Sequence, residues 1–198
     1  MSKLIALIIL IPLNIFGQSS IENDILLTTK KVNGVYRTFK EFRTNSPSIK
    51  GTLEVTKHRI KLLNHQTGKF ENIKESFWGA CINDTIYVFL KEPSTVYSPN
   101  IHILEFLGRY CYFIDQGEFT SRSGSTWSTS SYKFEYVVNI NNGIIYRIDK
   151  KLMRQILEKD PELLNEFEKE SSKKTVYKNY LEKLNSRRQA DIKSIEIN

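Results

Sequence analysis

Short turn sequences divide residues 52–148 into pairs of neighbouring strand-like segments. Connections of two or three residues join antiparallel strands, because a parallel pair needs a much longer crossover. The segments are 52–56, 59–63 and 69–73 around Gln66-Thr67-Gly68, 77–82 and 85–89 around Asn83-Asp84, 101–107 and 110–114 around Gly108-Arg109, and 132–140 and 144–148 around Asn141-Asn142-Gly143. We therefore predict a mostly antiparallel domain of about seven to nine strands, built as a small barrel, a sandwich or a bent sheet.

Helical spacing of apolar residues replaces the strand pattern from Lys150 onward. Asp160 and Pro161 are typical of a helix start, with Asp160 as the N-cap and Pro161 at the first helical position. The apolar stripes are Leu152, Ile156 and Leu157, then Leu163, Leu164 and Phe167, and finally Tyr177, Tyr180, Leu181 and Leu184. We expect an α+β chain with a β-rich domain at 18–149, two or three C-terminal helices packed on it at 150–187, and a loose tail at 188–198.

A further short helix is expected near the start of the β-rich domain. Thr38 and Glu41 have the spacing of a capping box, and Phe39 and Phe42 would share one side of the helix. Pro47 disfavours a helical residue before it, so the helix should end by that point.

The first seventeen residues, MSKLIALIILIPLNIFG, have the order of a cleavable secretory signal: a positive charge at Lys3, an apolar run over 4–16, and the small residue Gly17. The run would form a helix of about 20 Å against a bilayer core of about 30 Å, which disfavours the alternative of an uncleaved membrane anchor. No cysteine lies near the cleavage point, and no later segment is apolar enough to span a membrane. We predict cleavage after Gly17 and a mature protein in the periplasm or outside the cell, not lipid-anchored through cysteine.

The composition is that of a folded protein and argues against a nucleic-acid binder. Apolar residues make up 40% of the chain and aromatic residues 12%, enough for a hydrophobic core. The net charge is +7, but the basic excess is divided among separated pairs: Lys30-Lys31, Lys150-Lys151, Lys173-Lys174 and Arg187-Arg188. Nucleic-acid binders usually gather such charge on one face. The basic surface is therefore either simply solvated or suited to anionic envelope glycans or lipid headgroups.

The two cysteines, Cys81 and Cys111, leave two interpretations open. In an exported protein, a pair within strand-like segments suggests a disulfide across a sheet. The alternative is two buried thiols that pack as small apolar side chains. A catalytic thiol is not expected, because no histidine follows either cysteine in a known pattern.

Aromatic residues are the candidate binding residues. Trp127 is the one aromatic residue in the Ser/Thr-rich segment 120–131. This segment is a flexible loop, the tip of a long hairpin, or a recognition loop in which Trp127 stacks on a sugar or an aromatic ligand. Trp78 and Tyr87 would contribute if they line a sheet face, although a strand aromatic such as Trp78 more often packs inward.

The sequence carries no catalytic or metal-binding motif. A Gly-rich phosphate loop, HExxH, CxxC and GxSxG are all absent. His58, His65 and His102 lack the spacing of metal ligands, so neither a metal ion nor another cofactor is expected. The nearest candidates for acid–base chemistry are Asp115, Glu118 and His102, which would have to meet in one cleft.

Several stretches, taken in order, resemble a group of uncharacterised exported proteins common in Bacteroidetes-type bacteria. They read GVYRTFKEF and NSPS near the N-terminus, then FWGAC, NGIIY, ILEKDPELL and YLEKLN. The resemblance covers most of the mature chain. It implies an exported, envelope-associated protein and supplies no catalytic residues.

We interpret the chain as a non-enzymatic binding or interaction protein of the cell envelope, whose partner is a glycan, a lipid or a protein. One alternative is a small hydrolase of an envelope glycan or peptide, built on Asp115, Glu118 and His102. The other is a carrier of an apolar ligand, which would need a sheet closed around an empty cavity.

Overall fold

The fold is seen in a computed structural model that describes residues 24–56, 58–91, 101–123, 125–170 and 176–195. The predicted signal at 1–17 lies outside these residues. In chain order the elements are β1 Gly34–Tyr36, α1 Phe39–Arg43, β2 Leu53–Val55, β3 Ile60–Asn64, β4 Lys69–Asn72, β5 Gly79–Ile82, β6 Thr85–Phe89, β7 Ile101–Ile103, β8 Tyr110–Ser123, β9 Thr126–Asn139, β10 Ile145–Arg147, α2 Lys150–Leu157, α3 Pro161–Lys169 and α4 Tyr177–Ile195.

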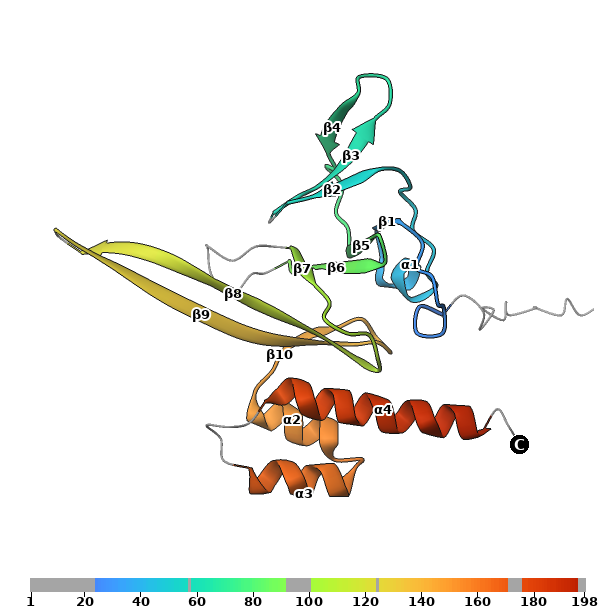
Figure 1. Ribbon diagram of the computed structural model, residues 1–198, viewed down its shortest axis with the longest axis vertical. Helices are drawn as coiled ribbons and strands as arrows, with labels where there is room; N and C mark the ends of the chain where they lie inside the picture. Colours follow the sequence, from blue (N-terminus) through green and yellow to red (C-terminus); the bar gives the residue numbers. More distant parts are fainter. Residues whose placement is uncertain (1–23, 57, 92–100, 124, 171–175, 196–198) are drawn as a thin grey trace, which may run out of the picture.

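The strands form three antiparallel sheets followed by C-terminal helices, which confirms the predicted α+β class (Figure 1). The strand orders are β1-β5-β6-β7, β10-β9-β8 and β2-β3-β4. The described strands do not close into a barrel, so the barrel among the predicted arrangements is not formed. The described residues contain ten strands rather than the predicted seven to nine. One reason is that the short extended piece Gly34–Tyr36 pairs with β5 as a strand of its own.

Three of the four predicted turns are confirmed. Asn83 and Asp84 join β5 to β6 with positive φ angles of 49° and 62°, the conformation that a tight two-residue hairpin requires at both positions. Gly68 before β4 and Gly143 before β10 also have positive φ, at 67° and 73°.

The predicted hairpin at Gly108-Arg109 is wrong. Strand β7 pairs with β6, and a single isolated bridge between Phe106 and Tyr112 links the following segment to β8. Gly108 packs instead against α4, where an added Cβ would lie 2.3 Å from Nδ2 of Asn185. A helix far away in the sequence therefore shapes this connection.

The Ser/Thr-rich segment 120–131 forms the end of a long hairpin, which is one of the alternatives predicted for it. Strands β8 and β9 pair without interruption from Tyr110–Asn139 to Ser123–Thr126. Cross-strand hydrogen bonds join the hydroxyls of Thr120 and Thr129 at 3.3 Å and of Ser121 and Ser128 at 3.0 Å. The distal part of this ribbon projects beyond the other elements (Figure 1).

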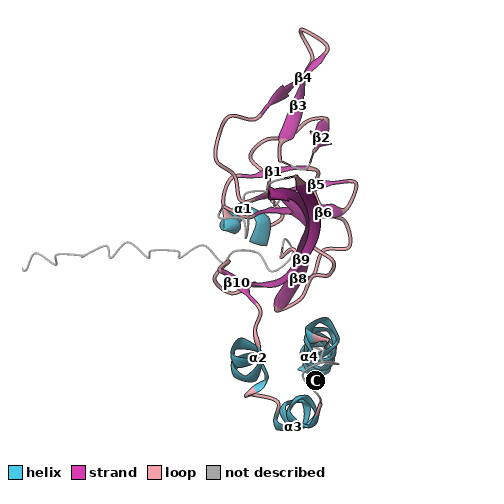
Figure 2. Cartoon of the chain, turned by 90° about the vertical axis from the view of Figure 1, so that its left-hand side faces the viewer, coloured by secondary structure: helices cyan, strands magenta, loops and turns pink. Residues whose placement is uncertain are grey.

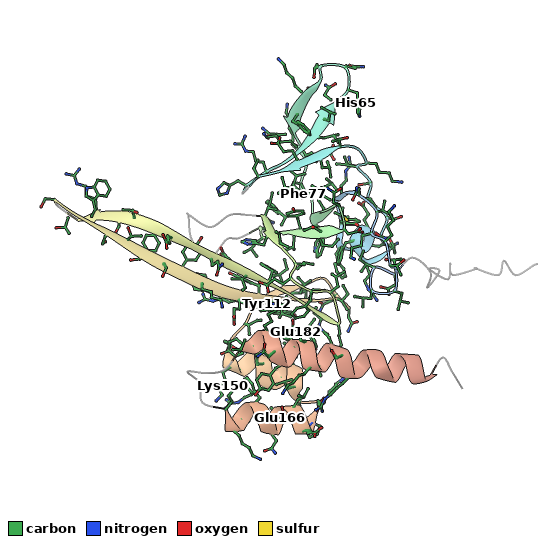
Figure 3. The ribbon with its side chains drawn as sticks, viewed as in Figure 1. His65, Phe77, Tyr112, Lys150, Glu166 and Glu182 are labelled. Atoms are coloured by element: carbon green, nitrogen blue, oxygen red, sulfur yellow. The ribbon has the colours of Figure 1, made fainter. Side chains whose placement is uncertain are left out.

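The proximal part of the ribbon separates two hydrophobic cores, because alternate residues of a strand point to opposite faces. Cys111 and Phe113 pack into one core with residues of β1, α1, β5 and β6. Tyr112 points the other way, into the core made by α2, α3 and α4. The three helices accordingly lie on the far side of the β10-β9-β8 sheet from α1 (Figure 2), with Tyr112 directed toward them (Figure 3).

Side-chain caps begin three of the helices. Thr38 Oγ1 accepts a hydrogen bond from the amide of Glu41 at 3.2 Å, and Asp160 Oδ1 accepts one from the amide of Leu163 at 3.1 Å. Both predicted helix starts are therefore confirmed. Asp149 caps α2 in the same way, through the amide of Leu152 at 2.7 Å.

The predicted tail at 188–198 is wrong over most of its length, since α4 continues to Ile195. Residues 188–195 include neither glycine nor proline, so no residue of the usual helix-ending types interrupts the helix.

The cysteines form no disulfide. Cys81 and Cys111 are both fully buried free thiols, which leaves the second of the two predicted interpretations. Each thiol donates to a different acceptor: Cys81 Sγ to Asn33 Oδ1 at 3.8 Å, and Cys111 Sγ to the Gly108 carbonyl at 3.3 Å. Burial raises the pKa of the Cys81 thiol and raises that of Cys111 to about 11, so both stay protonated at neutral pH.

Candidate functional site

An open cavity of about 420 Å³ lies where α1, the entry to β5, the end of β6 and the turn before β10 come together. We call it the aromatic pocket. Its lining consists of Arg37, Thr38, Phe39, Ser76, Phe77, Trp78, Phe89, Leu90, Lys91, Gly143 and Ile145. The volume is within the range of about 300–1,000 Å³ that small-molecule sites have.

Stacked rings hold the inner wall of the pocket in place. The ring centroid of Trp78 lies 4.3 Å from that of the fully buried Phe42, with 26° between the planes, and 5.4 Å from that of Phe39. Trp78 Nε1 is buried and has no hydrogen-bond partner among the described residues, so packing alone holds the ring. The wall is thus an extension of the core, fixed by its packing on buried side chains.

A second aromatic pair forms another part of the lining. The centroids of Phe77 and Phe89 are 5.1 Å apart, and both side chains are half-buried. Phe77 lies on the connection from β4 to β5 (Figure 3). The part of each ring that stays exposed offers an apolar face to a ligand.

Gly143 completes the pocket beside Phe39. Its φ of +73° is in the left-handed region, and an added Cβ would lie 2.3 Å from Cγ of Phe39. The turn can approach the ring this closely because it has glycine at that position. The position of Phe39 therefore depends on this turn.

Two cationic side chains stand in the lining, and their electrostatic environments differ. Arg37 Nη2 pairs with Glu75 Oε2 at 2.5 Å, which offsets its charge. Lys91 is exposed, and no carboxylate of the described residues forms an ion pair with it. Among the described residues, the lining thus sets a lysine without an ion-pair partner beside apolar rings, a combination that suits a ligand with an apolar body and a negative group.

The structure does not bring the three predicted binding residues together. Trp78 lines the aromatic pocket. Tyr87 does not line it, and packs instead against the cluster that includes Ile60 and Ala80, which Phe77 and Phe89 also contact. Trp127 stands near the tip of the hairpin, 65% exposed, with the guanidinium of Arg122 5.4 Å from its ring centroid.

The three candidates for acid–base chemistry do not share a cleft in the described structure. His102 and Asp115 are buried, at 5% and 0% exposure, and Glu118 is exposed on the opposite face of β8 from Asp115. The ring of His102 lies 5.2 Å from that of Phe113. None of the three lines the aromatic pocket. Both carboxylate oxygens of Asp115 lack a hydrogen-bond partner among the described residues.

Two further features bear on the remaining functional classes. Within the described residues, no cluster of three or more His, Cys, Asp or Glu side chains could hold a metal ion. In that same part of the chain, no helix has the length and apolar character needed to cross a bilayer. The open sheets also lack the closed wall around a cavity that the carrier interpretation required.

Sequence reasoning missed Phe77, Phe89 and Lys91 as site residues. Phe77 precedes Trp78, and that aromatic pair was the available signal. The Asn83-Asp84 turn predicted that β5 pairs with β6. This pairing sets Phe89 near Trp78, and the Phe89 amide donates a hydrogen bond to the Trp78 carbonyl at 2.9 Å. The end of β6 was predicted correctly at Phe89, but no local pattern indicates that Lys91 beyond it lies beside Phe39 and Gly143 of other elements.

A family model described as "Family of unknown function (DUF6563)" matches residues 34–188. The chain belongs to this family. The match begins at the first residue of β1 and takes in every residue that lines the aromatic pocket. For this DUF6563 protein, comparison with the curated proteins gave no match. Comparison with the solved structures gave none either.

Proposed function

We propose that this DUF6563 protein is an exported, non-enzymatic binding protein of the cell envelope and that the aromatic pocket is its ligand site. The observation that carries the proposal is an aromatic cavity whose wall packs on the core and whose lining includes Lys91, a lysine with no carboxylate partner among the described residues. Export is supported by the charged, apolar and small residues in order at 1–17.

The ligand is a small amphiphilic anion. Its apolar part packs on Phe77 and Phe89, where burial contributes about 25 cal/mol for each Å² removed from water. Its negative group lies near Lys91, whose charge has no carboxylate partner among the described residues. Because the rings already stack on the core, binding orders few side chains and retains most of the interaction free energy.

A set of matched small molecules tests this ligand class by thermal unfolding. We would compare a phenylalkyl carboxylate with the alcohol and the amine of the same chain length, alongside envelope glycans, peptidoglycan fragments and lipids. A ligand at about 100 times its dissociation constant adds about 2.7 kcal/mol to the free energy of unfolding, or about 5–10 °C for a chain of this size. The proposal predicts that the carboxylate raises the unfolding temperature more than the alcohol, and the alcohol more than the amine.

Two variants, one of them a control, test whether the positive charge of Lys91 is required for the preference for the carboxylate. Lys91→Glu should remove the preference for the carboxylate, whereas Lys69→Glu, on the exposed strand β4, should leave it unchanged. Equal effects of the three phenylalkyl compounds on the unmodified protein would contradict the anionic ligand.

Export is tested separately on the protein isolated from its producing cells. N-terminal sequencing of the envelope or medium fraction should begin at Gln18. A chain that retains residues 1–17 and stays in the cytoplasm would contradict the export part of the proposal while leaving ligand binding intact.

A further inference from the structure

The distal half of the long hairpin, residues 116–123 and 125–133, has two open edges, and the edge formed by β8 has an unusual charge pattern; we call this segment the arm. Strand β8 is the edge strand of its sheet, in the order β10-β9-β8. Along this edge Gln116, Glu118, Thr120 and Arg122 are all exposed. An edge strand presents unpaired N–H and C=O groups, a ready template for another strand.

The arm is also poorly supported by its own chain. Strand β10 covers β9 only at Tyr136, Val137 and Val138, close to the body of the protein. Beyond that point the arm is a two-stranded ribbon that projects from the other elements (Figure 1). Two-stranded ribbons are marginally stable in water, and added strands stabilise them.

The edge of β8 is complementary to itself. If two copies of β8 pair in antiparallel fashion about Thr120, the register sets Glu118 opposite Arg122 of the second copy, and Arg122 opposite its Glu118. Directly opposed residues of an antiparallel pair point to the same face, so each carboxylate meets a guanidinium. A two-fold axis then passes between the two Thr120 residues, as the commonest oligomer symmetry requires.

We propose that the arm is a self-association surface, and that two copies of the protein pair through β8 about Thr120 to form a four-stranded sheet of two arms. Within this sheet Arg122 lies between Trp127 of its own chain, with its guanidinium 5.4 Å from that ring centroid, and Glu118 of the second copy. Trp127 thereby orients the side chain that recognises the second copy. The paired surface is small, so we expect a dissociation constant of the dimer in the micromolar range or above.

Cysteine crosslinking tests the register directly. Thr120 and Thr129 share one hydrogen bond across the ribbon, so Thr120→Cys and Thr129→Cys remove the same interaction. Only Thr120 lies on the proposed two-fold axis. At about 100 µM protein, mild oxidation or a short thiol–thiol reagent should link two copies of Thr120→Cys and leave Thr129→Cys as a monomer. The natural thiols give little background because both are buried.

Charge complementation in the Thr120→Cys background tests the two ion pairs. In a dimer of Glu118→Lys, each new lysine lies opposite Arg122 of the other copy. In a dimer of Arg122→Glu, each new glutamate lies opposite Glu118 of the other copy. Each should crosslink on the order of tenfold less, because two pairs worth about 0.2–1 kcal/mol each become repulsive. A mixture of the two variants restores opposite charges in both pairs and should crosslink as well as the starting protein.

Equal crosslinking of Thr120→Cys and Thr129→Cys, or none by either, would overturn the proposal. So would a mixture that crosslinks no better than its components. In those cases Glu118 and Arg122 keep the open edge apart from other strands, which is the other known use of charges at a sheet edge.

Discussion

The side-chain amide of Asn185 makes two hydrogen bonds with the backbone of Tyr110. Its Oδ1 accepts from the Tyr110 amide at 3.3 Å, and its Nδ2 donates to the Tyr110 carbonyl at 3.0 Å. Asn185 is 7% exposed and belongs to α4, whereas Tyr110 is the first residue of β8. A helix side chain therefore satisfies the backbone groups that a neighbouring strand would otherwise pair, and it attaches the helices to the base of the hairpin.

Asn185→Asp should destabilise the protein by about 2–4 kcal/mol, because a buried carboxylate would then face the Tyr110 carbonyl and the donor would be lost. Asn179→Asp, at an exposed position of the same helix, is the control and should change stability by about 0.5 kcal/mol or less. Urea unfolding measures both. A similar loss for the two variants would show that the hydrogen bonds to Tyr110 do not matter.

Asp115→Asn should raise the free energy of unfolding at pH 7 by about 1 kcal/mol or more. Asp115 is fully buried, and its oxygens have no hydrogen-bond partner among the described residues, so a neutral side chain of the same shape is less costly to bury. Glu118→Gln, on the exposed face of the same strand, serves as the control. A drop in the unfolding temperature of Asp115→Asn would mean that the carboxylate is satisfied by a group outside the described residues.

Gly143→Ala should destabilise the protein by about 1–3 kcal/mol, since the new methyl group both strains a positive φ and collides with Phe39. Gly68→Ala is a useful comparison, because Gly68 has a similar φ of +67° but nothing within 4 Å of an added Cβ. Thermal unfolding of the two variants separates backbone strain from the collision. Equal losses would remove any special role for the contact with Phe39.

Stability should fall as the pH rises from about 9 to 11. The Cys111 thiol of the unfolded chain ionises near its ordinary pKa of 9.0, whereas burial raises this pKa in the folded protein to about 11. Between these values the unfolded chain binds fewer protons, so the stabilisation present below pH 9 is lost at about 1.4 kcal/mol per pH unit. Burial raises the pKa values of Tyr36 and Tyr112 as well, which acts in the same direction.

Cys111→Ala isolates the contribution of the thiol to this slope. Urea unfolding at pH 8, 9, 10 and 11, with a reductant present, should give a shallower fall for Cys111→Ala than for the unmodified protein. Parallel curves would contradict the raised pKa of Cys111.

Much of the fold follows from local sequence signals. The Asn83-Asp84 turn, the Thr38 and Asp160 caps and the Asn141-Asn142-Gly143 turn each act over a few residues, and each is found where its pattern predicts. The partner of β7 was mispredicted because the shape of the 104–109 connection depends on Asn185, which lies more than seventy residues further along the chain.

The candidate site was less accessible to the same reasoning. Trp78 was singled out for its residue type, but the pocket also needs Phe39, Phe89, Lys91 and Gly143, which come from three separate parts of the chain. Their meeting depends on how the sheets pack, and no periodicity encodes that packing. The self-complementary order of Glu118, Thr120 and Arg122 was present in the sequence, but it became meaningful only once β8 was known to be an edge strand.

The most direct test of the central claim compares two phenylalanine substitutions in a ligand titration. Phe77→Ala removes a ring from the aromatic pocket, whereas Phe70→Ala removes an exposed ring, 42% accessible, from the distant strand β4. Calorimetric titration with the compound that most raises the unfolding temperature should show at least about tenfold weaker binding for Phe77→Ala and unchanged binding for Phe70→Ala. Equal affinities of Phe77→Ala and the unmodified protein would contradict the assignment of the aromatic pocket as the ligand site.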